Sequence, residues 1–182
     1  MAFDWYEICE LGDSSLEQGD FVPECPIVVP PSSIAEGNEV DVEVQLIDSI
    51  IMSQSCDLDN GKIDIVLVCP YYNLRYWIEN ALPTNERTSK KAQKKAIENL
   101  KRGYLPGYHL LQKCPNHGLE DWQVVDFRNV YGINFDLLQN IVSKTEQQRL
   151  RLLSPYKEHL SQAFARYFMR VGLPSEIIVE GY

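Results

Sequence analysis

Four side chains within five residues could take part in nucleophilic chemistry: Ser53, Ser55, Cys56 and Asp57. A thiol or hydroxyl needs a base within hydrogen-bond reach, and His109 could serve if its strand lies beside this stretch. The alternative is a capped turn in which Ser and Asp side chains bind their own backbone and Cys56 fills the core. A lone Cys and a lone His are a weak signal, so the sequence favours the structural interpretation.

The polar corner at residues 53–61 lies between two apolar stretches, residues 49–52 and 63–69, which are predicted to be strands. Asn60 and Gly61 supply the positive φ angles that a tight hairpin turn requires. The sequence therefore predicts a central β-hairpin whose connection is a candidate functional centre.

The five cysteines are scattered without a CxxC pair, and their odd number in a chain without an export signal indicates free thiols. Cys114 and His117 have a spacing that could chelate zinc. A structural zinc site needs about four ligands, however, and a second pair is missing. We therefore predict neither a metal site nor a cofactor.

Length and composition indicate one folded domain over residues 1–182, with 45% hydrophobic and 24% charged residues. No apolar run approaches the roughly 20 residues that span a bilayer. The N-terminus lacks both a basic start and an apolar signal core, so we expect a cytoplasmic chain without membrane contact. The net charge of −9 repels polyanions and argues against a nucleic-acid binder.

The N-terminal third begins with an acidic segment, residues 1–18, which we expect to dock on the body through its rings, Phe3, Trp5 and Tyr6. Gly19 marks a turn that leads into a strand. Four prolines follow, so residues 23–39 are predicted to be an irregular loop. From residue 39 to 46 apolar side chains alternate with acidic or amide ones, which predicts a half-buried strand with one acidic, solvated face.

The middle of the chain changes in composition after Pro70, which is expected to end a strand before the aromatic stretch at residues 71–77. Apolar side chains at helical spacing then predict an inserted helix over residues 84–102, capped by residue 88 or 89 and ended by Gly103. Its polar side carries five lysines and an arginine: Lys90, Lys91, Lys94, Lys95, Lys101 and Arg102. A solvated charged face is the ordinary interpretation, and a binding surface for phosphate or an acidic protein is the alternative.

The C-terminal third is predicted to contain strands at residues 108–111 and 122–131, while residues 137–143 fit a strand or a helical turn. A helix over residues 155–172 is the clearest element, because one apolar stripe runs along it. Its ends carry an N-cap, a first-position proline and a glycine stop: Ser154, Pro155 and Gly172. Together these elements predict an α+β fold that is mainly β.

Several short motifs follow one another in a recognisable order: Gly19-Asp20 before the first strand, an apolar strand ending at Ser53, the Asn60-Gly61 turn, a strand ending at Pro70, and an Arg-Leu stretch from Arg149 to Pro155. In this order they resemble the PemK/MazF-like family, small β-barrels with a C-terminal helix that include ribosome-independent endoribonuclease toxins. The resemblance implies a small β-barrel to which the basic helix has been added. It also implies a homodimer, since toxins of the family commonly dimerise.

The chain departs from the family at the residues that cut RNA. Family ribonucleases carry an Arg-Pro pair before the strand that ends in Ser, and the corresponding stretch here ends in Ile47-Asp48. An Asp would repel a phosphate where the family Arg stabilises its charge. The Ser or Thr that the family uses after the next strand falls near Tyr71. Unless Arg102 or Arg128 takes over the role of the family Arg, the resemblance implies that ribonuclease chemistry is lost.

The favoured function is a non-catalytic binding or regulatory module in a bacterial stress, toxin–antitoxin or phage-defence system, with a protein as partner. The residues expected to make contacts are Ser53, Gln54, Cys56, Asp57, Tyr71, Lys90, Lys91, Lys94, Lys95 and Tyr108. The basic helix and the aromatic stretch at residues 71–77 are the candidate contact surfaces. The alternative is an endoribonuclease toxin that binds RNA and uses relocated groups, His109, Arg128 and Arg102. A third interpretation is a structural subunit of a larger assembly.

Overall fold

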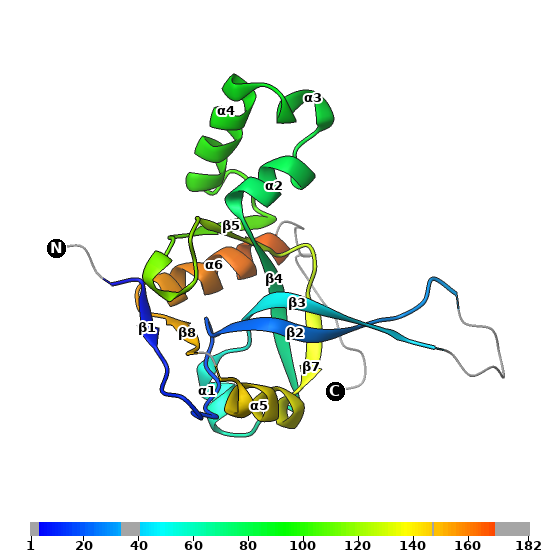
Figure 1. Cartoon of the computed structure of the whole chain (residues 1–182), viewed down its shortest axis with the longest axis vertical. Coiled ribbons are helices and arrows are strands. Elements are labelled where there is room, and N and C mark those ends of the chain that lie inside the picture. The colour runs from blue at the N-terminus through cyan, green and yellow to red at the C-terminus, as the bar shows by residue number, and fades with distance from the viewer. Residues whose placement is uncertain (1–3, 34–40, 147, 170–182) are drawn as a thin grey trace, which may run out of the picture.

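The computed structural model describes residues 4–33, 41–146 and 148–169. It is an α+β structure, mainly β, as the sequence predicts (Figure 1). Six strands form one antiparallel sheet in the order β2-β3-β4-β6-β5, with β7 beside β4, and β1 pairs with β8. Because the two outer strands, β2 and β5, each have one neighbour among the described strands, this sheet is open, and the expected closed barrel is wrong. The strands are β1 (Tyr6–Ile8), β2 (Phe21–Val29), β3 (Glu43–Ile51), β4 (Ile65–Asn73), β5 (Tyr108–Leu111), β6 (Gln123–Asp126), β7 (Tyr131–Asn134) and β8 (Leu150–Leu152).

The helices connect these strands or cover the sheet. They are α1 (Ser55–Asp59), α2 (Leu74–Ala81), α3 (Thr84–Arg87), α4 (Lys90–Lys101), α5 (Phe135–Lys144) and α6 (Tyr156–Phe168). None of the helices among the described residues is long and apolar enough to cross a membrane.

Strand β2 corrects the first part of the loop predicted for residues 23–39, since it runs through Pro23 and Pro26 to Val29. Residues 30–33 form no strand, and residues 34–39 lie outside the described residues. Strand β2 tolerates both prolines because it is an edge strand and because its pairing with β3 shifts between Val22 and Cys25. Glu24 lies in that shift with a φ of 48°. The outer halves of β2 and β3 project from the body as a two-stranded arm (Figure 1).

The prediction of a half-buried strand from residue 39 is also wrong, because in the arm the apolar side of this strand is exposed. Residues 39 and 40 lie outside the described residues, and β3 begins at Glu43. Val42, Val44 and Leu46 are 53%, 55% and 64% exposed. Alternation predicted a buried face, but no other described layer covers this part of the arm.

The predicted pairing of the strands around the corner is confirmed, since β3 and β4 are antiparallel neighbours. The prediction of a tight turn between them is wrong, because the connection contains the short helix α1. Gly61 alone has a positive φ, 58°, whereas Asn60 has a φ of −92° as the residue that ends α1.

Strand β4 continues through Pro70 rather than ending there. Pro70 pairs with Ser49 on β3. On its other side, β4 pairs with β7 up to Val68 and with β6 from Tyr71, so Pro70 lies in the gap between these partners. Residues 71–73 of the aromatic stretch therefore belong to the sheet, and residues 74–77 begin α2.

The predicted helix at 84–102 is divided into α3 and α4, which Figure 1 shows with α2 as a group beyond the sheet. Ser89 caps α4, as predicted, because its hydroxyl accepts a hydrogen bond from Ala92 N at 3.3 Å. Ala96 and Leu100 bury the apolar side of α4 against Trp77 and Val124.

The single strand predicted for residues 122–131 is two strands, β6 and β7. The Asp126 carboxylate forms the turn between them by accepting hydrogen bonds from Arg128 N at 3.0 Å and Asn129 Nδ2 at 3.2 Å. Strand β5 is found as predicted. Residues 137–143, which fit a strand or a helical turn from the sequence alone, belong to the helix α5.

The C-terminal helix is present as α6, but Pro155 holds the cap position and Ser154 does not act as N-cap. The Ser154 hydroxyl instead donates to Glu158 Oε1 at 2.6 Å. The expected stop at Gly172 lies outside the described residues. Trp5 stacks on Tyr156 with ring centres 3.7 Å apart, and Tyr6 meets Phe21 edge to face, so these two rings dock the N-terminal segment as predicted. The third predicted ring, that of Phe3, lies outside the described residues.

The core lies on both faces of the central strands because neighbouring side chains point in opposite directions. Ile50 packs in a cluster with Leu160 of α6, whereas Ile51 packs in a cluster with Leu138 and Val142 of α5. This sandwich fixes β3 and β4, the strands that position the site described next.

Candidate functional site

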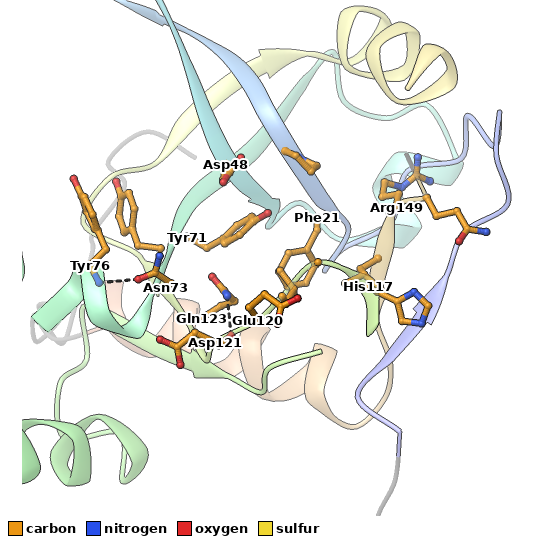
Figure 2. Close-up of a pocket in the computed structure, with 16 residues that line it drawn as sticks. Phe21, Asp48, Tyr71, Asn73, Tyr76, His117, Glu120, Asp121, Gln123 and Arg149 are labelled. Carbon is orange, nitrogen blue, oxygen red and sulfur yellow. Dashed lines mark hydrogen bonds between the residues drawn. The ribbon is translucent and has the colours of Figure 1, made fainter. Parts of the chain in front are cut away.

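A cavity of about 480 Å³ opens between the inner end of β2, the second half of β4 and the segment 117–123. Figure 2 shows Phe21, Asp48 and Tyr71 facing its middle, with Glu120, Asp121 and Gln123 across from them. Tyr76 and Asn73 lie at one end, and His117 and Arg149 lie at the other. Its size is in the range of small-molecule and side-chain pockets.

One wall of the cavity is aromatic. Phe21 and Tyr71 meet edge to face with ring centres 4.9 Å apart, and Tyr72 stacks on Tyr76 at 5.0 Å. Asn73 creates the second pair, because its side chain accepts a hydrogen bond from Tyr76 N at 2.7 Å and starts α2 directly after β4. The strand-to-helix transition thus places three tyrosines along one cavity.

The cavity is also acidic, since Asp48, Glu120 and Asp121 line it. Asp48 Oδ1 accepts a hydrogen bond from Glu24 N at 2.9 Å, which holds the irregular part of β2 in place. Asp121 Oδ1 accepts one from Trp122 N at 2.8 Å. Each of these carboxylates keeps a second oxygen that bonds to no other described residue.

Tyr71 is buried, and burial, followed by the negative charge of Asp48, raises the pKa of its hydroxyl. The hydroxyl is therefore protonated at neutral pH. Burial, followed by the charge of Asp126, raises the pKa of Tyr72 to about 12. Both tyrosines consequently present neutral rings with hydroxyl donors beside the carboxylates.

Arg149 does not neutralise the cavity, because its guanidinium is already engaged. Nη1 donates to Asp13 O at 3.1 Å and Nη2 donates to Ser15 O at 2.6 Å. Nε has no hydrogen-bond partner among the described residues, but it lies 3.3 Å from Oδ2 of the buried Asp20, whose carboxylate balances part of the guanidinium charge. The cavity therefore combines aromatic rings with unneutralised carboxylates, an environment that favours a positively charged group.

Of the residues predicted to make contacts, Tyr71 lies in this cavity and the polar corner does not. Ser53 is buried, and its hydroxyl accepts a hydrogen bond from Leu67 N at 2.8 Å. Gln54 precedes α1, and Asp57 pairs with Lys62 at 3.8 Å. Cys56 is exposed rather than in the core, and its Sγ lies 3.8 Å from Gln54 Oε1.

The base considered for the corner is elsewhere. His109 on β5 pairs with Val125 on β6, and its side chain forms no hydrogen bond with any described residue. The three groups proposed for a relocated ribonuclease do not converge. His109 and Arg102 line a separate depression, whereas the Arg128 guanidinium binds Asp126 at 2.7 and 2.9 Å.

The remaining predicted contacts lie in the helical group and on β5. Lys90, Lys91, Lys94 and Lys95 are exposed and form no ion pair within the described part of the chain. Lys91 and Lys95 flank an apolar hollow between α2 and α4. Tyr108 lies under Arg128, whose guanidinium carbon is 4.5 Å from the ring centre.

Several cavity residues lie outside the predicted contact surfaces: Phe21, Asp48, Glu120, Asp121 and Gln123. The aromatic stretch was a usable signal, because residues 71–77 were expected to offer a contact surface. The acidic residues of the segment 117–123 could not be predicted from neighbouring residues, because the pairing of β4 with β6 brings this segment beside β4.

No group of His, Cys, Asp and Glu that could hold a metal ion is found among residues 4–33, 41–146 and 148–169. All five cysteines are free. No model of a known protein family matches the chain. A search of curated proteins finds no significant match either.

Proposed function

We propose that this chain is a non-catalytic binding module whose acidic, aromatic cavity receives a positively charged side chain of a protein partner. The observation that carries the proposal is the combination of Asp48, Glu120 and Asp121 with the tyrosine wall. The guanidinium nearby, that of Arg149, is engaged by Asp13, Ser15 and Asp20.

Arginine is the favoured residue for this cavity. Its planar guanidinium can stack on Tyr72 or Tyr76 while its N–H groups donate to carboxylates. It is also more weakly hydrated than a lysine ammonium, so its transfer into a half-closed cavity costs less. We therefore propose a basic peptide segment as the recognised part of the partner.

The same features oppose hydrolysis of RNA in this cavity. A phosphodiester would approach three carboxylates, and no free cationic side chain of the described residues lines the cavity to stabilise a developing charge. Asp48 and Tyr71 are the positions where the PemK/MazF-like resemblance implies Arg-Pro and Ser or Thr. Their presence in one cavity supports a family cleft converted from RNA cleavage to protein binding, in a stress, toxin–antitoxin or phage-defence system.

The test is a titration of isotope-labelled protein with the peptide acetyl-Gly-Arg-Gly-amide, followed by NMR chemical shifts. We expect the largest shifts at Tyr71, Asn73 and Gln123. The variant Asp48→Asn/Glu120→Gln should bind about tenfold more weakly, because two carboxylates lose their charge while the hydrogen bond from Glu24 N to residue 48 is kept.

The matched control is Asp59→Asn/Glu79→Gln, which removes the same charge from exposed positions of α1 and α2 that do not line the cavity. It should change the affinity less than about twofold. Equal weakening by both double variants would mean that net charge, and not the cavity, attracts the peptide.

A further inference from the structure

A second depression, of about 440 Å³, lies between the end of α4, strand β5 and helix α6. It is distinct from the acidic cavity, but the two share one short segment. Asp121 and Gln123 line the acidic cavity, whereas Trp122 between them lines the depression. Because successive side chains of an extended segment point in opposite directions, this stretch separates two sites of contrasting chemistry.

The depression is basic although the whole chain has a net charge of −9. No Asp or Glu of the described residues lines it. Its basic side chains come from three elements and are Lys101, Arg102, His109, His159 and Arg166. Glu98 is the nearby acidic group, and it pairs with Lys101 at 3.5 Å and with Arg102 Nε at 2.8 Å. Glu98 offsets one of the three positive charges of Lys101, Arg102 and Arg166, so net positive charge is left for an anion.

Three of the basic side chains in this depression are free for a ligand, and Arg102, which Glu98 engages through Nε, keeps two terminal nitrogens that bond to no described residue. The side chains of His109, His159 and Arg166 form no hydrogen bond or ion pair with any residue in the described part of the chain. His109 is held from below by Phe127, whose ring stacks at 6.3 Å. Burial, followed by the nearby His159, lowers the pKa of His109 to about 4, so at neutral pH its ring is a neutral donor on the floor.

Two indoles border the cations. Trp5 is fixed by its stack on Tyr156, and Trp122 is 36% exposed. Aromatic rings beside positive charge are the combination that proteins use for nucleotides, because the base stacks while the phosphate meets Arg and Lys.

We propose that the depression between α4, β5 and α6 binds the phosphate of a nucleotide through Arg102 and Arg166, with the base on the Trp122 side. The nucleotide is a free mononucleotide or one unit of a single-stranded RNA, since both present the same phosphate and base. This site is independent of the proposed function of the acidic cavity.

The test uses fluorescence anisotropy of a fluorescein-labelled octauridylate, with competition by uridine monophosphate and by inorganic phosphate. We expect binding that weakens about tenfold in Arg102→Gln/Arg166→Gln, because two charge-assisted contacts to phosphate are lost. The dependence of affinity on salt should flatten by about 0.7 in log–log slope for each phosphate contact removed.

The control is Arg75→Gln/Lys144→Gln, which removes the same charge from exposed positions of α2 and α5 that do not line the depression. It should change affinity less than about twofold. If uridine monophosphate competes at the same concentration as unlabelled octauridylate, the ligand is a free nucleotide. If octauridylate binds more tightly than uridine monophosphate, the ligand is RNA. The proposal is overturned if no probe binds, if both double variants weaken binding equally, or if inorganic phosphate competes as well as the nucleotide.

Discussion

Arg151 and Asp20, which are 131 residues apart in the chain, form a buried bidentate ion pair, with Nε to Oδ1 at 2.5 Å and Nη2 to Oδ2 at 3.0 Å. Arg151 also reaches Glu17 Oε1 at 2.8 Å. The pair joins the Gly19-Asp20 motif to the Arg-Leu stretch of β8. Two motifs that carry the resemblance to a toxin family therefore hold the N-terminal segment in place, and the Arg-Leu stretch also contributes Arg149 and Leu150 to the lining of the acidic cavity.

Replacing Arg151 with Met should destabilise the protein by about 3 kcal/mol, because Asp20 would lose its bidentate partner while remaining fully buried. Urea unfolding followed by circular dichroism measures the change. The control Lys62→Gln breaks the exposed pair with Asp57 and should cost less than about 0.5 kcal/mol. Similar losses in both variants would contradict a structural role for the buried pair.

Two glycines with positive φ should respond differently to substitution by alanine. Gly61 has open space around it, so Gly61→Ala should cost about 1 kcal/mol from backbone strain alone. At Gly19 an added Cβ would lie 2.8 Å from Leu152 Cβ, so Gly19→Ala should cost clearly more than Gly61→Ala. Thermal unfolding of the two variants side by side decides this, and a smaller effect at Gly19 would be inconsistent with its close contact to β8.

The local elements that the sequence predicts well are those with a local physical cause. The cap at Ser89, strand β5 and the turn at Gly19 depend on neighbouring residues, and each is found. The errors arise where partners distant in the chain decide. Pro70 remains in a strand because its position falls between two pairing partners, and the apolar side of Val42 and Val44 is exposed because no layer covers the arm.

The candidate site shows the same division. Tyr71 could be identified because it lies in an aromatic stretch and at a position where the resemblance implies a functional residue. Glu120 and Asp121 follow a polar loop that is unremarkable in the sequence, and only the pairing of β6 with β4 brings them opposite Tyr71. Conversely, the polar corner concentrates reactive residue types locally, but Ser53 uses its hydroxyl to bind Leu67 N.

Stability should fall as the pH is lowered from 6.5 toward 4, and part of this change should come from His109. Burial, followed by His159, lowers its pKa from 6.5 to about 4. Between these values the unfolded chain binds a proton that the folded chain does not, so acid favours unfolding. The positive charges of Lys101, Arg102 and Arg166 border the same depression and act in the same direction.

The measurement is the urea midpoint at pH 7.5, 6.5, 5.5 and 5.0, for which we expect His109→Gln to show a flatter pH dependence than the wild type. His117→Gln, at an exposed position outside this depression, is the matched control and should retain the wild-type slope. An unchanged slope in His109→Gln would show that His109 does not titrate as described.

The cysteines should differ sharply in reactivity. Cys56 is exposed, whereas Cys25 and Cys69 are fully buried, and burial is the main cause that raises the pKa of each to about 12. Iodoacetamide in native buffer, followed by mass spectrometry, should modify Cys56 first and reach Cys25 and Cys69 only after unfolding. Modification of Cys25 at the rate of Cys56 would contradict the packing of β2 on the core.

Recognition of a positive charge by the acidic, aromatic cavity can be tested with one pair of ligands. The two ligands are acetyl-Gly-Arg-Gly-amide and the same peptide with citrulline in place of arginine. Citrulline replaces the charged guanidinium with a neutral group of nearly equal shape. We predict that the arginine peptide shifts the NMR signals of Tyr71, Asn73 and Gln123 saturably, and that the citrulline peptide binds at least about tenfold more weakly. Equal affinity of the two peptides, or shifts that spare these residues, would contradict the claim.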